Sequence, residues 1–321
     1  MGFSERMIRI RSIRKLIRWL QHIELPGFDG IPLWYVGKFF LTGLFKGSIT
    51  HRAAAISFSI IVAIFPMIIV FFSIIPFLPI ENFQQVLFNF INNITPDQAE
   101  PIIQKTVVDI ISRPRRGLLS FNFVLALYFA SNGFDSIIEA FNNTYHTPPQ
   151  VRSWLKQKLV SILLFFITSL LIIVGITLLI GGSWFLNLLQ EKNLIAPGLS
   201  YYLLVGVRWL VILALFFFTF SFIYYLAPAK ASKFRFISAG SSLATLLTLV
   251  ATIGFNYYVQ NFSTYNALYG SIGTILVIMI WVYFNAMILL IGFELNASIQ
   301  HAGRENLMKE LDAQKGWNVR L

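Results

Sequence analysis

The sequence predicts an all-α polytopic membrane protein with six transmembrane helices and both termini in the cytoplasm. Of its 321 residues, 56% are hydrophobic and only 12% are charged, about half of the roughly 25% charged residues of soluble domains. Six apolar runs reach the length of about 20 residues that a helix needs to cross a hydrocarbon core. Basic residues are also distributed unevenly between alternate connecting segments, which is typical of a protein oriented in a membrane.

Residues 1–50 are predicted to be a basic, amphipathic cytoplasmic segment. Near its start, apolar side chains recur at helical spacing and share one stripe, opposite a face rich in arginine and lysine. The apolar stripe consists of Ile10, Ile13, Leu16, Ile17 and Leu20. This pattern favours a helix that lies on an anionic membrane surface. The alternative is an ordinary helix packed against the cytosolic side of the protein.

A membrane domain over residues 51–297 follows, and a cytoplasmic tail over 298–321 ends the chain. The predicted membrane helices cover about 53–78, 118–138, 159–181, 201–226, 237–259 and 269–293. Pro66 lies in the middle of the first helix and is expected to kink it, because proline removes a backbone hydrogen bond. The loop 80–117 contains two amphipathic helical patterns. They predict either a helical cap over a central cavity or a helical hairpin lying on the outer surface.

The orientation follows from the lysine and arginine residues of the loops. The segments 1–52, 139–158, 227–236 and 296–321 hold 19 of the 25 basic residues, and the three intervening loops hold five. The arginines of "RPRR" (Arg113–Arg116) oppose this bias locally. The larger number of basic residues places both termini in the cytoplasm.

A group of polar residues stands at the cytoplasmic ends of three predicted helices. It consists of His51, Arg52, Asn132, Asp135, Glu139, Glu294 and Asn296. An ionisable side chain at bilayer depth costs about 2.5–3.5 kcal/mol, so it is expected to pair, to face the bundle interior or to reach the interface. Arg52 could pair with Asp135, Glu139 or Glu294. The cluster is therefore interpreted as a salt bridge that fixes helix packing, or alternatively as part of a substrate or proton path.

Other single residues also suggest roles. Arg208 lies roughly 10 Å below the outer end of its helix, where it either extends along its stem to the interface or contacts an anionic ligand such as a lipid phosphate. Gly270 and Gly273 stand at the outer start of the sixth helix. Glycines let helix backbones approach closely, so these two predict helix packing.

The chain lacks the usual motifs of enzymes and cofactor sites. It has no cysteine, and its four histidines show no metal-chelating spacing. No nucleophile elbow or phosphate-binding loop is present. The net charge of +11 is attributed to membrane topology and attraction to anionic lipid rather than to nucleic acid. We therefore expect no enzyme activity, no cofactor and no metal, with membrane lipid as the partner.

The sequence resembles the YihY / virulence factor BrkB family of bacterial inner-membrane proteins from about Phe40 to Gln300. The resemblance is carried by "HRAAAISFSIIVAIFP" (His51–Pro66), "SNGFDSIIEAFNNTYH" (Ser131–His146), "YYLAP" (Tyr224–Pro228) and "YNALYGSIGTILVIMIWVYFNAMILLIGFELNAS" (Tyr265–Ser298). It implies a six-helix inner-membrane protein, supplies no catalytic residues, and makes the ribonuclease label once given to some members look like a misassignment.

Three functions are consistent with these patterns. The first is a transporter or lipid-translocating protein of the cell envelope, with a water-accessible cavity lined by the polar face of the second helix and the end of the sixth. The second is a scaffold that forms a homo-oligomer and uses its polar residues in pairs. The third, less favoured, is a membrane enzyme acting on lipid, in which His51 converges with Asp135, Glu139 or Glu294.

Overall fold

The fold is known from a computed structural model that describes residues 15, 19–74, 116–145, 152–191, 197–229, 235–261 and 263–318. These ranges are helical apart from short turns and one isolated β-bridge between Glu24 and Pro32. The helices are α3 (Leu33–Lys46), α4 (Ile49–Ile74), α7 (Arg116–Asn142), α8 (Trp154–Glu191), α9 (Pro197–Leu226), α10 (Ala239–Asn261) and α11 (Ser263–Asn318).

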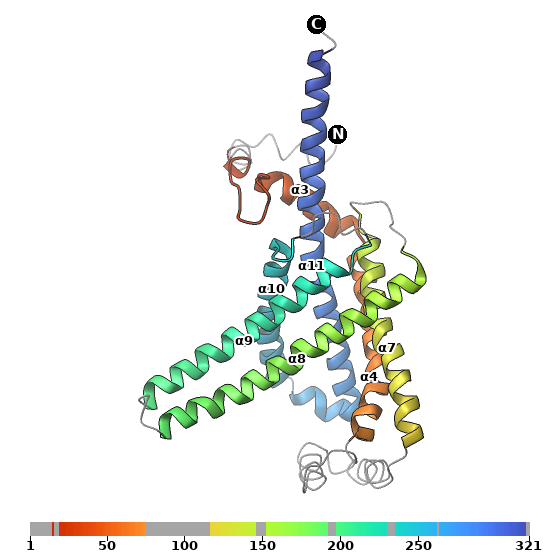
Figure 1. Cartoon of the computed structure of the whole chain (residues 1–321), viewed down its shortest axis with the longest axis vertical. Coiled ribbons are helices and arrows are strands. Elements are labelled where there is room, and N and C mark those ends of the chain that lie inside the picture. The colour runs from red at the N-terminus through yellow and green to blue at the C-terminus, as the bar shows by residue number, and fades with distance from the viewer. Residues whose placement is uncertain are drawn as a thin grey trace.

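The helices form an upright bundle and an oblique hairpin (Figure 1). In the bundle, α4 packs along α7 and α11, and α10 packs along α11. The hairpin consists of α8 and α9, which lie side by side; α8 also contacts α7, and α9 contacts α10. The far end of the hairpin projects away from the bundle in Figure 1. The helices therefore follow from the local sequence, and the contacts between them bring together segments that are far apart in the chain.

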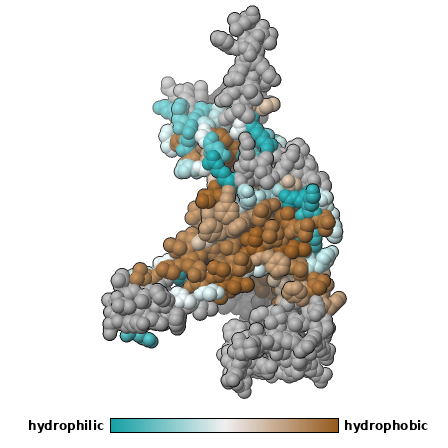
Figure 2. Space-filling model, in the orientation of Figure 1, coloured by the Kyte–Doolittle hydropathy of each residue, from teal (hydrophilic) through white to brown (hydrophobic). Residues whose placement is uncertain are grey.

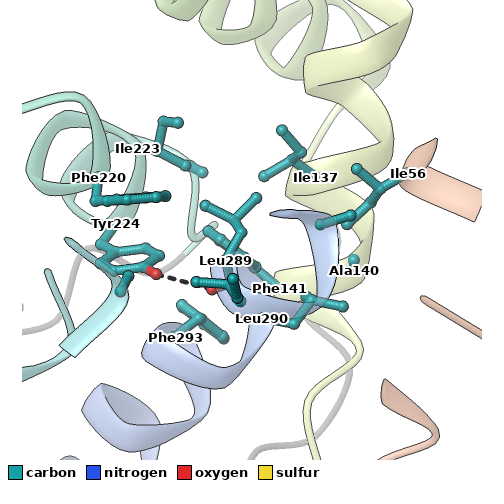
Figure 3. Packing of buried hydrophobic residues seen from close by; sticks show 14 of the residues in the cluster. Ile56, Ile137, Ala140, Phe141, Phe220, Ile223, Tyr224, Leu289, Leu290 and Phe293 are labelled. Atoms are coloured by element: carbon teal, nitrogen blue, oxygen red, sulfur yellow. Dashed lines mark hydrogen bonds between the residues drawn. The ribbon is translucent and has the colours of Figure 1, made fainter. Parts of the chain in front are cut away.

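The main core lies where α4, α7, α9, α10 and α11 meet, with Leu164 added from α8 (Figure 3). The rings of Phe141 and Phe293 are parallel, with centroids 3.9 Å apart. Tyr224 is buried beside them, and its hydroxyl donates a hydrogen bond to the main-chain oxygen of Leu289 at 2.8 Å. Since a buried tyrosine hydroxyl needs a partner, this bond fixes the end of α9 against α11.

Two glycines allow the backbones of α10 and α11 to touch. A side chain at Gly240 would overlap the main-chain oxygen of Gly292, and one at Gly292 would overlap the hydroxyl of Tyr224. Only glycine gives room for this approach. The close crossing sets the positions of the α11 residues that follow Gly292, including Glu294 and Asn296.

A smaller core joins the N-terminal segment to α11. Its buried members are Phe28, Ile31, Val36, Leu295, Ile299 and Ala302. The helix α3 runs across α11 at this point, and the ring of Phe39 meets that of His301 edge-on at 4.8 Å. Part of the predicted cytoplasmic segment 1–50 is therefore a helix packed on the membrane domain; the apolar stripe from Ile10 to Ile17 lies outside the described residues.

In the part of the chain that the structure describes, five helices are long and apolar enough to cross a membrane by length and composition. They include Ile49–Ile68, Trp154–Leu178, Val205–Leu226, Ala239–Val259 and Ile275–Glu305. The helix α7 is not among them, and it carries the polar residues Asn132, Asp135 and Glu139. It nevertheless packs along α4 over much of its length. The all-α polytopic fold is thus confirmed, and the count of six spans stays a prediction.

The helices extend further than the apolar runs. Helix α8 has 38 residues and α11 has 56, which at 1.5 Å per residue is roughly 57 Å and 84 Å. A hydrocarbon core is only about 30 Å thick, so these helices must tilt or continue beyond it. Helix α11 does continue, through most of the predicted tail 298–321. The two predicted helices of loop 80–117 lie outside the described residues; of that loop the structure describes only 116–117, at the start of α7.

The surface of the hairpin is apolar. Along α8, large side chains such as Leu159, Leu163, Phe166 and Leu170 are exposed, and Figure 2 shows a hydrophobic band across α8 and α9. Soluble monomers rarely expose so large an apolar patch. This surface is therefore suited to contact with lipid.

Candidate functional site

The polar residues predicted at the cytoplasmic side form two separate groups rather than one cluster. The first, here called the buried lock, consists of Arg52, Thr144 and Glu294. The second, here called the open site, consists of Tyr128, Asn132, Asp135, Lys158 and Ser161. The two groups share α7 as a common wall but use different partner helices. The predicted cluster is divided in this way because Glu294 pairs with Arg52 and Asp135 pairs with Lys158.

The buried lock joins α4, the end of α7 and α11. Arg52 donates to the Glu294 carboxylate at 2.5 Å, and the Thr144 hydroxyl lies 3.1 and 2.9 Å from its two oxygens. Arg52 also donates to the main-chain oxygen of Ala140 at 2.8 Å. The side chain of Glu294 is fully buried and that of Arg52 is 10% exposed. Of the three carboxylates considered for Arg52, Glu294 is the partner in the structure.

Asn296, two residues after Glu294 on α11, has a structural role. Its side-chain oxygen accepts a hydrogen bond from the Gly240 N–H at 2.8 Å, and its side-chain nitrogen lies 3.0 Å from the Ser238 hydroxyl. Ser238 precedes α10 and accepts a bond from the Ser241 N–H at 3.2 Å. Free N–H groups at a helix start need such acceptors. Asn296 therefore helps cap α10 from α11.

The open site lies between α7 and α8. Lys158 donates to the Asn132 side-chain oxygen at 2.5 Å and to Asp135 at 2.8 Å, and its ammonium lies 4.7 Å from the centre of the Tyr128 ring. The other oxygen of Asp135 accepts a hydrogen bond from the buried Ser161 hydroxyl. Tyr128, Asn132 and Asp135 follow at i, i+4 and i+7, so that they share one face of α7.

The open site differs from the buried lock in exposure. The side chains of Lys158 and Asp135 are 13% and 24% exposed, and Tyr128 is 53% exposed. Glu139, one turn beyond Asp135, is exposed as well. Ionisable residues of membrane helices usually face the bundle interior or a water-filled cavity and pair there, or extend to the interface near helix ends. The ion pair of Asp135 and Lys158 is partly exposed at the surface formed by α7 and α8.

The remaining predicted residues lie apart from both groups. His51 is exposed at the start of α4, and Arg208 is exposed on α9. Pro66 is buried within α4, which continues through it, and the kink stays a prediction. Gly273 is buried and Gly270 is part of α11. Within the described ranges, no group of three or more histidine or carboxylate side chains is placed to hold a metal ion.

Sequence reasoning missed Tyr128, Thr144, Lys158 and Ser161 as site residues. Lys158 entered the prediction only as a basic residue of a cytoplasmic segment. The available signal was its place near the start of a long apolar helix with Ser161 one turn later, so that both face one neighbour. Which neighbour this is depends on the packing of α8 on α7. Thr144 lies just beyond α7 and gives no signal of its own.

These features define an all-α polytopic integral membrane protein whose ionisable groups pair inside a frame of apolar helices. The family follows from comparison with known proteins: a model described as "Virulence factor BrkB" matches residues 40–315. The chain belongs to this family, as the resemblance in its sequence predicts.

Several relatives are similar over most of the chain. The ribonuclease-like protein YfkH of Bacillus subtilis is 30% identical over 80% of this chain and 94% of its own length. A UPF0761 membrane protein of Idiomarina loihiensis is 28% identical over 68% of this chain and 73% of its own length, and one of Haemophilus influenzae is 24% identical over 86% and 98%. No solved structure matches. The two UPF0761 relatives are named membrane proteins.

Proposed function

We propose that this chain is a transporter of the bacterial cell envelope that moves lipid, or another molecule with a polar head and an apolar tail, across the inner membrane. The open site is the single observation that carries this proposal. Intramembrane ionisable residues that face a cavity or path usually mark the route of a substrate. The buried lock contributes by holding α4, α7 and α11 in place around that route, and we propose no catalytic role for either group.

The surroundings of the open site favour an amphipathic substrate. Along α7, the outer side chains Phe121, Phe123 and Val124 are exposed, and on α8 Leu155 and Leu159 are exposed. The polar stripe of α7 thus borders apolar surface that suits acyl chains. A headgroup could contact the stripe while its chains stay in lipid, which lowers the cost of moving polar groups through hydrocarbon.

The proposal is tested with the purified full-length protein in liposomes that contain a fluorescent phospholipid. Chemical quenching of the outer leaflet measures how fast the lipid exchanges between leaflets. We expect the protein to accelerate exchange, and Asp135→Asn or Lys158→Met to slow it at least about tenfold. Either change removes one charged contact for the headgroup, a hydrogen bond to a charged group contributes about 1.5–3 kcal/mol, and each 1.36 kcal/mol is tenfold in rate.

Matched controls come from the same helix. Lys156 and Glu191 are exposed on α8 outside the open site, so Lys156→Met and Glu191→Gln should exchange lipid at the unmodified rate. Exchange no faster than in empty liposomes would refute the proposal. Equal rates in the site variants and the controls would refute the role of the open site.

A second candidate is a scaffold that forms a homo-oligomer in the membrane. The exposed apolar side chains of the α8–α9 hairpin favour it, because a second copy could cover them as well as lipid does. Native mass spectrometry of the detergent-purified protein would show a stable oligomer, and this protein would not accelerate lipid exchange. Glu294 is fully buried whereas His51 is exposed, which disfavours the enzyme hypothesis in which these two residues converge.

A further inference from the structure

The open site holds an ammonium group in a three-sided cage. Lys158 supplies the ammonium, and α7 supplies the cage: the Asn132 oxygen at 2.5 Å, the Asp135 carboxylate at 2.8 Å and the face of the Tyr128 ring at 4.7 Å. A carboxylate, a neutral acceptor and an aromatic face are the groups that recognise a primary ammonium. All three groups come from one face of a single helix, α7, which fixes their spacing.

The cage is also preorganised and accessible. Ser161 is fully buried and holds the second oxygen of Asp135, so the carboxylate keeps its orientation. The exposed ring of Tyr128 and the partly exposed Asp135 leave a way in from the outer surface of α7. A ligand can therefore reach the cage from the lipid without opening the core.

We propose that this cage binds the primary ammonium of a zwitterionic aminophospholipid, which takes the place of the Lys158 ammonium while Lys158 pairs with the lipid phosphate. The inference rests on the proposed function, because it names the class of lipid that the open site handles. It departs from the expectation of an anionic lipid at this protein.

Charge balance favours the zwitterion. Asp135 and Lys158 carry one charge of each sign and pair with each other. When a zwitterion binds, its ammonium pairs with Asp135 and its phosphate pairs with Lys158, so the site stays neutral. An anionic lipid would leave one negative charge in excess, and an unpaired charge at bilayer depth is unfavourable. A quaternary ammonium has no N–H to give to Asn132 and Asp135, so both acceptors would lose a hydrogen bond.

The test is competitive lipid binding to the full-length protein, measured by native mass spectrometry. Phosphatidylethanolamine, phosphatidylcholine and phosphatidylglycerol with identical acyl chains are offered in equal amounts. We expect phosphatidylethanolamine to be retained roughly tenfold or more over the other two, since a hydrogen bond between charged groups contributes about 1.5–3 kcal/mol. This measurement needs no variant.

Variants then locate the preference. Asp135→Asn should abolish it, whereas Glu191→Gln should keep it. Lys158→Met should keep the preference for the primary over the quaternary ammonium, because the cage is intact and vacant. Equal retention of phosphatidylethanolamine and phosphatidylcholine would overturn the inference, and a preference for phosphatidylglycerol would overturn it in favour of an anion site at Lys158.

The outcome is separable from that of the proposed function. Lipid exchange without any headgroup preference in binding would overturn the cage and keep the transporter. A preference for phosphatidylethanolamine that Asp135→Asn abolishes, in a protein that exchanges no lipid, would keep the cage and overturn the transporter.

Discussion

Neutralising Glu294 should destabilise the protein more than removing any exposed charge. Glu294→Gln removes the charge from a fully buried side chain and leaves Arg52, which is 10% exposed, without a counter-ion. Breaking one side of a buried ion pair costs about 3–5 kcal/mol. The amide oxygen of glutamine can still accept one hydrogen bond from Arg52, so we expect a loss of roughly 3 kcal/mol, the lower end of that range, in the free energy of unfolding.

The assay is equilibrium unfolding of the purified protein in mixed micelles with increasing dodecyl sulfate, followed by tryptophan fluorescence. A double-mutant cycle with Arg52→Met isolates the pair, and residues in contact couple by about 0.5–3 kcal/mol. The control is the exposed pair of Asp29 and Arg235, whose atoms are 3.0 Å apart and whose side chains are 44% and 70% exposed. Asp29→Asn should cost less than about 1 kcal/mol.

Two results would refute this reasoning. One is a loss from Glu294→Gln no larger than that from Asp29→Asn. The other is strict additivity of Glu294→Gln and Arg52→Met, which would mean that the two side chains do not share an interaction. Either result would remove the buried lock as a reason for the arrangement of α4, α7 and α11.

Three further outcomes are expected. Gly240→Ala should lower the free energy of unfolding by about 1–3 kcal/mol, because the new methyl group overlaps α11; Gly206→Ala, which meets nothing within 4 Å, is the control and should not lower it. Tyr224→Phe should cost about 1 kcal/mol through its lost hydrogen bond, and no loss in the same unfolding assay would contradict the role of that hydroxyl. The chain has no cysteine, so single cysteines can be introduced as labels. A cysteine at Lys46 should react with impermeant maleimide only from the cytoplasmic side, and one at Glu191 only from the outer side. The reverse labelling would overturn the predicted orientation.

The sequence by itself determined that the protein lies in a lipid bilayer and where its helices are. A low charge content and long apolar runs require a membrane helix protein, because unpaired backbone groups cannot be left in lipid. These signals are local, so residues 201–226 and 237–259 come within a few residues of α9 and α10. The helix ends are less determined, because α8 and α11 continue through residues that are no longer apolar.

The tertiary structure alone decided which polar residues meet. Arg52 had three candidate carboxylates in the sequence, and only the packing of α4 on α11 selects Glu294. Lys158 gave no sign of its partners, because Asn132 and Asp135 lie more than 20 positions away on another helix. Helical periodicity places a side chain on a face of its own helix, whereas the neighbour of that face is set by close contacts such as the glycine crossing of α10 and α11. The sequence therefore indicates the polar residues of the site, and the packing divides them into a sealed pair and an open one.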